Sequence, residues 1–282
     1  MIGIGPADPR YPRRLLDLRS APDPLWIDGD ADVLAGRTVS IVGTRRMTPY
    51  GDRVARELAS ACAEAGILVV SGLAQGVDSS AHEGALAAHG RTVAVLGAGI
   101  ASYLADTRGR RRRLAHAIRS SGALVSEFPP EAPPQKWTFA QRDSTIAALG
   151  ELTVVVEAPL GSGALITADE ARKLRRPVFA VPGPIGVGAS AGANALIASG
   201  QAGALTGAPM LLEALGARAS VPTVDGDDLA LRVLDALAAA PADPDTLARR
   251  LGIRGPAFAT VIARLLIRGQ IAAAADGRLA RR

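Results

Sequence analysis

Three glycine-rich segments of the chain combine residue types that bind phosphate groups. They occupy residues 43–46, 71–78 and 161–167. In the first, Gly43 allows an anion to approach the backbone, Thr44 offers a hydroxyl and Arg45 offers a two-pronged guanidinium contact. The other two run into helical patterns, and free N–H groups at a helix start favour anions. The chemistry indicated is the binding of a phosphate-bearing ligand, although each segment alone also fits a tight turn between a strand and a helix.

A fourth segment, residues 134–143, interleaves basic and aromatic side chains. Lys136 and Arg142 flank Trp137 and Phe139. This pattern suits contact with a nucleic-acid backbone together with stacking of bases from a single strand. The alternative is a loop whose aromatic side chains only fill the core.

Other polar residues give weaker indications of chemistry. An acid–base set could be formed by Asp78, Glu157 and Glu170, but their spacing in the sequence does not require one. Asp78 equally suits a helix cap. His82 is interpreted as a hydrogen-bonded structural histidine and Cys62 as a core residue. We therefore expect no catalytic residue, no metal site and no cofactor.

Residues 97–102 approach the dinucleotide fingerprint G-x-G-x-x-G/A, but the match is weak. Ser102 holds the last position, and we expect no helix to open there.

The elements that must position these segments form an alternating pattern. Short, β-branched apolar runs alternate with helical stretches. The apolar runs are at 38–42, 67–70, 92–96, 123–126, 153–157 and 178–181, and the helical stretches are near 51–65, 79–89, 111–121, 140–149 and 164–174. Such runs are typical of parallel strands covered on both faces. We expect an α/β fold over residues 37–215, with a doubly wound, mostly parallel, extended Rossmann-like sheet and a ligand site at the carboxyl ends of its strands.

The flanking regions differ from this core. Residues 1–36 are proline-rich and predict an irregular N-terminal extension that packs on the main domain through Leu15, Leu18, Leu25 and Trp26. Residues 216–228 predict a linker. Residues 229–282 predict three helices and a hairpin around Asp276-Gly277, which describes a small C-terminal winged-helix domain.

Composition narrows the class of protein. The chain has 282 residues, 48% of them hydrophobic and 21% charged, which argues against global disorder. A single cysteine excludes an intrachain disulfide framework. No signal-peptide pattern and no run of 18 apolar residues occurs, so we expect a cytoplasmic protein without a membrane association. The net charge of +5 and pI of about 10.1 are compatible with an anionic partner.

Taken in order, these segments resemble the DNA-processing protein A family (DprA, also called Smf). The resemblance rests on residues 41–45, 71–78 with Ala81-His82, 139–142, 162–168, 181–183 and 190–197. It implies an extended Rossmann domain that dimerises and binds single-stranded DNA. It also implies a role in natural transformation and recombination, in which the protein protects incoming DNA and loads the RecA recombinase.

The resemblance also assigns roles to single residues. Gly43, Thr44 and Arg45 would hold a DNA phosphate, and the residues beside them that complete the DNA contact are Ser71, Gly72, Gln75, Gly76, Lys136, Phe139, Arg142, Ser162, Gly163 and Thr167. The family usually has Arg-Asn-Arg where this chain has Arg142-Asp143-Ser144. We hypothesise that nearby arginines partly replace the lost charge; these are Arg108, Arg110, Arg111, Arg112 and Arg113. Candidate DNA contacts in the C-terminal region are Arg254, Arg264 and Arg268.

The sequence also fits two other functions. One is a nucleotide-processing enzyme of the lysine-decarboxylase-like phosphoribohydrolase type, but residues 160–165 lack its Pro-Gly-Gly-x-Gly-Thr series. The other is a nucleotide-sensing winged-helix transcription regulator, which needs a G-x-G-x-x-G that residues 41–46 do not supply.

Overall fold

The computed structural model of the chain describes residues 1–217, 226–253, 256–274 and 277–281. The chain divides into two units, residues 1–219 and 220–282. Residues 218–225 of the expected linker lie outside the described residues, as do Arg254 and Asp276.

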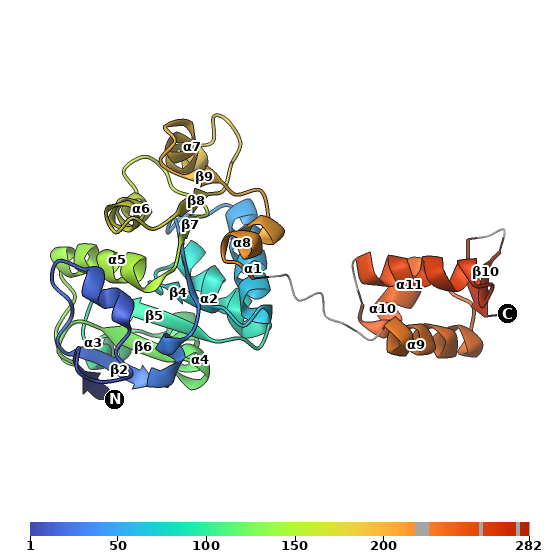
Figure 1. The fold of residues 1–282 in the computed structure, drawn as a ribbon, viewed down its shortest axis with the longest axis horizontal. Coiled ribbons are helices and arrows are strands. Elements are labelled where there is room, and N and C mark those ends of the chain that lie inside the picture. Colours follow the sequence, from blue (N-terminus) through green and yellow to red (C-terminus); the bar gives the residue numbers. More distant parts are fainter. Residues whose placement is uncertain (218–225, 254–255, 275–276, 282) are drawn as a thin grey trace. The chain divides into compact units, whose positions relative to one another are not determined.

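A nine-stranded sheet forms the middle of the first unit (Figure 1). Its order is β1-β2-β6-β5-β4-β3-β7-β8-β9, parallel from β6 to β9, with β2 antiparallel to both β6 and β1. The strands are β1 (Ile2–Ile4), β2 (Leu25–Gly29), β3 (Thr38–Val42), β4 (Leu68–Ser71), β5 (Thr92–Leu96), β6 (Ala123–Ser126), β7 (Thr153–Val155), β8 (Val178–Ala180) and β9 (Gly203–Ala204). Strands β3 to β8 match the six predicted runs closely, so the predicted α/β fold is confirmed.

The order of the strands places a topological switch between β3 and β7. From β3 the chain builds β4, β5 and β6 on one side, and then returns to build β7, β8 and β9 on the other. Strand β3 therefore pairs in parallel with both β4 and β7. The connections that leave β3 and β7 diverge at this point, and the crevice between them is where open α/β sheets bind ligands.

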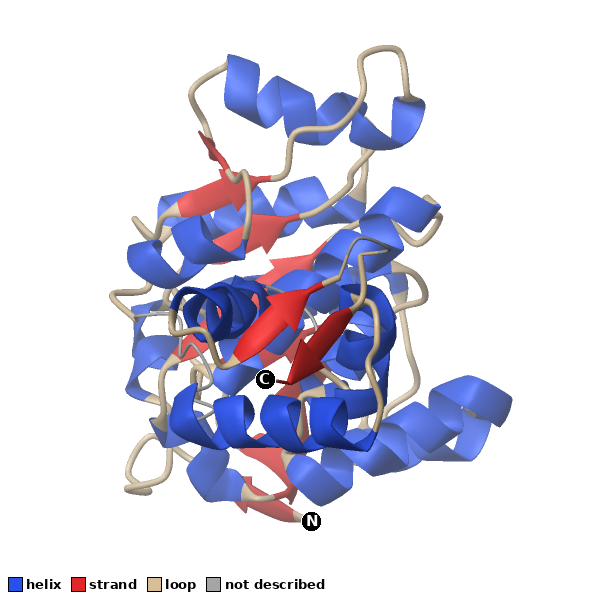
Figure 2. Cartoon of the chain, turned by 90° about the vertical axis from the view of Figure 1, so that its right-hand side faces the viewer, coloured by secondary structure: helices blue, strands red, loops and turns tan. Residues whose placement is uncertain are grey.

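Helices cover both faces of the sheet, as the coloured elements of Figure 2 show. The helices of this unit are α1 (Pro49–Glu64), α2 (Val77–Ala87), α3 (Ile100–Asp106), α4 (Gly109–Ser121), α5 (Lys136–Leu149), α6 (Gly163–Lys173), α7 (Ala191–Ala198) and α8 (Ala208–Ala214), with short 3₁₀ turns η1 (Arg13–Asp17), η2 (Ala31–Ala35) and η3 (Gly188–Ser190). Among the described residues, no helix is long and apolar enough to cross a membrane.

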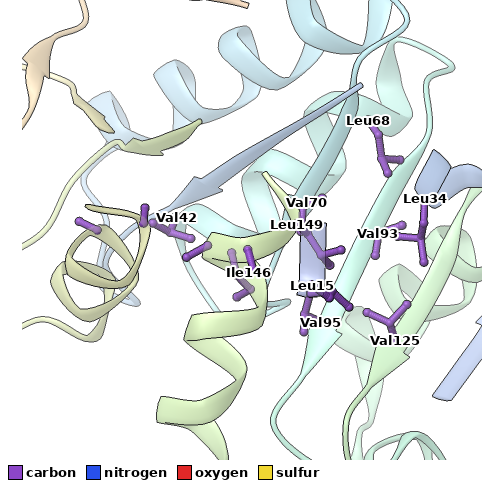
Figure 3. Close-up of a cluster of buried hydrophobic side chains, with 14 of the residues drawn as sticks. Leu15, Leu34, Val42, Leu68, Val70, Val93, Val95, Val125, Ile146 and Leu149 are labelled. Carbon is purple, nitrogen blue, oxygen red and sulfur yellow. The ribbon is translucent and has the colours of Figure 1, made fainter. Parts of the chain in front are cut away.

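The alternation of side chains along each strand divides the core between the two faces. On β5, Val93 and Val95 belong to the cluster shared with η1, α5 and α6, whereas Ala94 and Leu96 belong to the cluster under α3 and α4. Figure 3 shows part of the first cluster, in which Leu15 and Ile146 lie with these valines. Because both faces are apolar, the strands read in sequence as continuous hydrophobic runs.

Two sequence expectations about local structure are wrong. Residues 1–36 are not irregular, because β2 pairs with β6 and β1 pairs with β2, which extends the main sheet. The expected packing of this region is present: Leu15 and Leu25 are buried, and Leu18 and Trp26 pack partly buried against the core. A helix does open after Gly99, because the fully buried Ile100 anchors the short helix α3.

The second unit consists of three helices and a two-stranded hairpin. These are α9 (Gly226–Ala239), α10 (Pro244–Leu251), α11 (Pro256–Ile267), β10 (Ile271–Ala273) and β11 (Leu279–Arg281). Val233, Leu247 and Leu265 lie at the centre of a separate hydrophobic core. The winged-helix architecture predicted for this region is therefore confirmed.

Candidate nucleic-acid interface

A cleft of about 350 Å³ opens at the carboxyl ends of β3 and β7, at the topological switch. We call it the cradle. It brings together residues of all three glycine-rich segments, which are far apart in the sequence. The residues that line it are Val42, Gly43, Thr44, Arg45, Arg46, Ala74, Asp78, Arg142, Asp143, Ile146, Pro159, Ser162, Gly163, Ala164 and Thr167. Arg46 and Asp143 were not among the predicted contacts, although Arg46 follows Arg45 directly in the sequence.

The loop after β3 is held in place by its neighbours. A Cβ atom on Gly43 would lie 2.6 Å from Val77 Cγ2, so this close approach requires glycine. The N–H of Thr44 donates to the carbonyl oxygen of Glu157 at 2.6 Å, and the carbonyl oxygen of Thr44 accepts from the N–H of Val77 at 3.2 Å. The loop is thereby fixed both to the segment after β7 and to the start of α2.

Glu157 supports the cradle from beneath rather than facing it. Its side chain is buried, and the carboxylate accepts from the Thr48 N–H at 2.8 Å and from the Thr48 hydroxyl at 2.6 Å. The Thr48 hydroxyl in turn accepts from the Gly51 N–H and caps α1. Glu170 instead pairs with Lys173 on the surface of α6 at 2.8 Å. The carboxylates of the hypothetical acid–base set are thus engaged separately.

The wall opposite the β3 loop contains a buried ion-pair network. Arg142 is 5% exposed. Its Nη1 atom lies 3.8 Å from Asp78 Oδ2, and its Nε atom lies 3.3 Å from Asp143 Oδ1. Burial raises the pKa of Asp78 and raises the pKa of Asp143 to about 6, while the charge of Arg142 acts in the opposite direction on both. Two carboxylates therefore share one buried guanidinium at the edge of the cradle.

Helix α6 begins at the other edge of the cradle. Ser162 is its N-cap residue, and the Ser162 hydroxyl accepts from the Ala164 N–H at 3.4 Å. Gly163 is exposed, and Thr167, one turn later, is buried in the lining. The first turn of α6 consequently directs N–H groups and the positive end of its dipole at the cleft.

The basic–aromatic segment forms the start of α5, earlier than the expected helix start near residue 140. Phe139 is 37% and Trp137 56% exposed, so the alternative of aromatic side chains that fill the core is wrong. The guanidinium carbons of Arg45 and Arg142 lie 5.8 Å and 5.9 Å from the centroid of the Phe139 ring. Lys136 is exposed at the first position of the helix.

A second cleft, of about 500 Å³, shares Arg45, Ala74 and Arg142 with the cradle. We call it the aromatic cleft, because Phe139 and Tyr103 both line it. Its lining is Arg45, Gly72, Leu73, Ala74, Gln75, Leu96, Gly97, Ala98, Tyr103, Asp106, Thr107, Arg108, Arg111, Pro134, Phe139 and Arg142. Tyr103 was not predicted as a site residue, and its place depends on the unexpected helix α3.

The glycine-rich segment after β4 is divided between these features. Ser71 is fully buried and its hydroxyl donates to the carbonyl oxygen of Ile41 at 2.6 Å, so it lies behind the clefts. Gly72 lies beneath the guanidinium of Arg142, where a Cβ atom would overlap that group. Gln75 is exposed in the lining of the aromatic cleft. Gly76 adopts a φ of 88° directly against the backbone of Thr44.

Comparison with known proteins identifies the family. The profile of the DNA recombination-mediator protein A family matches residues 3–216, and that of the DprA winged helix domain matches residues 217–277. The chain belongs to the DNA recombination-mediator protein A family. The family name describes a recombination mediator and not an enzyme.

Relatives in this family include Protein Smf of Escherichia coli (strain K12), 40% identical over 196 residues, which are 69% of this chain and 52% of that protein. The putative DNA processing protein DprA of Mycobacterium tuberculosis is 45% identical over 179 residues, 62% of this chain and 45% of that protein. The chain spans about half the length of the first curated relatives it matches.

Two solved structures from the family have the same fold. DprA from Streptococcus pneumoniae superposes with a TM-score of 0.70 at 34% identity, covering 75% of this chain and 73% of that one. DNA processing protein A from Helicobacter pylori superposes with a TM-score of 0.67 at 28% identity, covering 76% of this chain and 94% of that one. Its structure is described as giving insight into a unique single-stranded DNA binding mode.

The arginines suggested as accessory contacts in this family member differ in their surroundings. Arg110 makes a two-pronged contact with Glu83 at 2.8 and 2.6 Å, and Arg108 donates to the carbonyl oxygens of Ala105 and Thr107. The guanidinium carbon of Arg111 lies 5.8 Å from the Tyr103 ring centroid. Two further arginines, Arg112 and Arg113, are exposed on α4, and in the winged helix Arg264 is half-buried and Arg268 exposed.

His82 is a hydrogen-bonded structural residue, as predicted from the sequence. It is fully buried, and Nδ1 lies 2.7 Å from the Thr92 hydroxyl. That hydroxyl donates to the carbonyl oxygen of Val69, so it accepts from the Nδ1–H of a neutral imidazole. Burial lowers the pKa of His82 to about 3. Among the residues that the structure describes, no group of three or more His, Cys, Asp or Glu side chains is placed to hold a metal ion.

Proposed function

We propose that this chain binds single-stranded DNA through the cradle and Phe139, and that this binding serves the processing of incoming DNA in natural transformation. On this proposal it acts in the cytoplasm as a homodimer, protects the incoming strand and loads the RecA recombinase. The membership of the family supports this role, as does the single-stranded DNA binding described for the Helicobacter pylori relative. The observation that carries the proposal is the meeting of residues 43–46 with the start of α6 in one cleft beside an exposed aromatic ring.

The geometry suits an unpaired strand in particular. A phosphate in the cradle would lie between Arg45, Arg46 and the first N–H groups of α6. Phe139, which is 37% exposed, lies next to Arg45 in the lining of the aromatic cleft, and we propose that an unpaired base stacks on it there. A base inside a duplex presents no free face to such a ring, so we propose that the contact selects single strands without reading their sequence.

The two alternative functions find less support. A nucleotide-processing enzyme needs a free acid or base beside the ligand, but Glu157 is bonded to Thr48, and Asp78 and Asp143 share Arg142. A nucleotide-sensing regulator needs a dinucleotide loop after β3, and the segment there continues as Gly43-Thr44-Arg45. Neither is favoured by a specific observation.

The test is a fluorescence anisotropy titration of labelled oligo-dT with the full chain. We expect Arg45→Ala to weaken binding by about ten-fold or more, because it removes a charge-assisted phosphate contact. The slope of log affinity against log salt should also fall by about 0.7. Lys136→Ala should weaken binding in the same direction.

Arg91→Ala is the matched control. It removes the same charge from an exposed arginine that precedes β5, at the opposite end of the strands from the cradle. Binding that is equally insensitive to Arg45→Ala, Lys136→Ala and Arg91→Ala would refute the assignment of the cradle. Acceleration of RecA assembly on single-stranded DNA, and its loss in Arg45→Ala, tests the mediator role separately.

A further inference from the structure

A third cleft, of about 440 Å³, adjoins Arg45 from the side of α4. We call it the arginine cleft. Its walls come from the loop after β3, from the start of α2 and from the first turns of α4. The lining residues are Arg45, Arg46, Met47, Gln75, Gly76, Ser79, Ser80, Glu83, Arg110, Arg111 and Leu114.

The three clefts are connected through shared walls. Arg45 lines the cradle, the aromatic cleft and the arginine cleft. Gln75 and Arg111 line both the aromatic and the arginine clefts. A chain-like ligand that leaves the cradle across Arg45 therefore enters a region that Arg111 also lines.

The arginine cleft has a strong excess of positive charge. Four arginines line it against one carboxylate, Glu83. Glu83 is already shared by Arg56 and Arg110, and these contacts lower its pKa against the effect of burial. Helix α4 has no acidic residue in its first turn to balance its consecutive arginines. This arrangement favours a ligand with repeated negative charges.

The aromatic cleft adds two stacked pairs on its walls. Arg45 lies over Phe139, and Arg111 lies over Tyr103 at 5.8 Å. The Tyr103 hydroxyl oxygen is buried and has no hydrogen-bond partner in the structure. Asp106 contributes one opposing charge to the lining. Alternating aromatic rings and guanidinium groups match the alternating bases and phosphates of a single strand.

We propose that single-stranded DNA continues from the cradle past Arg45 and is held a second time by Arg111, with Tyr103 and Arg46 beside it. This extension rests on the proposed binding of single-stranded DNA and lengthens its footprint. Arg111 is the principal contact, because Arg110 is held by Glu83 and Arg108 by backbone carbonyl oxygens.

The test compares oligo-dT of about 5 nucleotides with oligo-dT of about 15 nucleotides, a span that covers the usual footprints of single-strand sites. Arg111→Ala should weaken binding of the longer oligonucleotide by about ten-fold and leave the shorter one close to the parent value. Its salt slope should fall by about 0.7 for the longer oligonucleotide alone. Arg111→Lys should restore part of the affinity, because it keeps the charge but loses the planar stacking on Tyr103.

Arg119→Ala is the control on the same helix, since Arg119 pairs with Asp28 near the other end of α4. Circular dichroism of each variant checks that α4 remains folded. If Arg45→Ala weakens both oligonucleotides while Arg111→Ala weakens neither, the second contact is refuted and the proposed function stands. If Arg111→Ala weakens both lengths equally, Arg111 belongs to the cradle itself and the extended path is refuted.

Discussion

Replacement of Asp143 by asparagine should tighten DNA binding in a way that depends on pH. Asp143 lines the cradle with only 14% of its side chain exposed. A Cβ atom placed on Gly163 would lie 3.9 Å from Asp143 Oδ2, so the carboxylate faces the start of α6, where we place the phosphate. Asparagine has the same shape and retains an oxygen at the position of Asp143 Oδ1, which lies 3.3 Å from Arg142 Nε.

The size of the effect follows from the charge that the substitution removes. Two like charges about 5 Å apart repel by about 1 kcal/mol at the dielectric constant of water and by about 3 kcal/mol at an effective value near 20. The cradle is open to solvent on one side and Arg142 offsets part of the charge, so the lower figure of about 1 kcal/mol applies, which corresponds to about a five-fold gain in affinity.

The pH dependence has a definite sign. Burial raises the pKa of Asp143 to about 6 in the folded protein, with opposing contributions from Arg142 and Arg45 and a reinforcing one from Asp78. Above that pH the carboxylate is ionised and repels a phosphate; below it the group is neutral. The parent protein should therefore lose affinity as the pH rises through about 6, and Asp143→Asn should lose less.

The assay is an anisotropy titration of short oligo-dT at about pH 5 and about pH 8, on either side of the Asp143 transition. Glu213→Gln, which removes one carboxylate from an exposed site on α8, is the matched control. A gain in affinity of the same size at both pH values, or no gain near pH 8, would refute the reasoning. The first result would mean that Asp143 acts through shape, and the second that its charge does not reach the ligand.

Three further predictions concern Glu157, Gly72 and His82, all buried in the first unit. Glu157→Gln should lower the free energy of unfolding by about 1 to 3 kcal/mol in urea titrations, because one of the two donors of Thr48 loses its carboxylate acceptor. Gly72→Ala should lower the free energy of unfolding of the parent protein, because the added Cβ atom overlaps the guanidinium of Arg142. In an Arg142→Ala background the same substitution should lower it much less. Equal losses in the two backgrounds of this double-mutant cycle would contradict the reasoning. The pKa of His82 is lowered to about 3, so its imidazole should stay neutral in NMR titrations down to about pH 4. The free energy of unfolding should decline as the pH falls below about 6.5, because the unfolded chain then takes up a proton on His82 that the folded chain does not. An imidazole signal of the folded protein that titrates near pH 6.5 would contradict this.

The parallel strands could be predicted from the sequence because each is buried on both faces. Runs such as residues 38–42 and 92–96 are continuous and β-branched, and all five positions of each strand are buried. The N-terminal strands lacked this signal. Only Ile4 of β1 is buried, and both strands gain their order by pairing with segments distant in the sequence. A local pattern carries no information about such pairing.

The position of the cradle was predictable for a similar reason, but the directions of its side chains were not. The glycine-rich segments follow strands, so their meeting at one sheet edge follows from topology. Whether a hydroxyl faces the ligand depends on the register between neighbouring strands, and Ser71 bonds inward to Ile41 instead. The burial of Arg142 depends on Asp78, which comes from a different helix.

The surroundings of Arg142 change how the cradle should hold a phosphate. Three arginines in the lining face two aspartates, so above about pH 6 most of the charge of Arg142 is neutralised within the protein. The attraction then comes chiefly from Arg45 and Arg46 together with the N–H groups at the start of α6. A grip of this kind fixes one phosphate firmly but gives little affinity along the rest of the strand. Contacts outside the cradle, of which Arg111 is the best placed, are therefore needed for a long strand to bind more tightly than a short one.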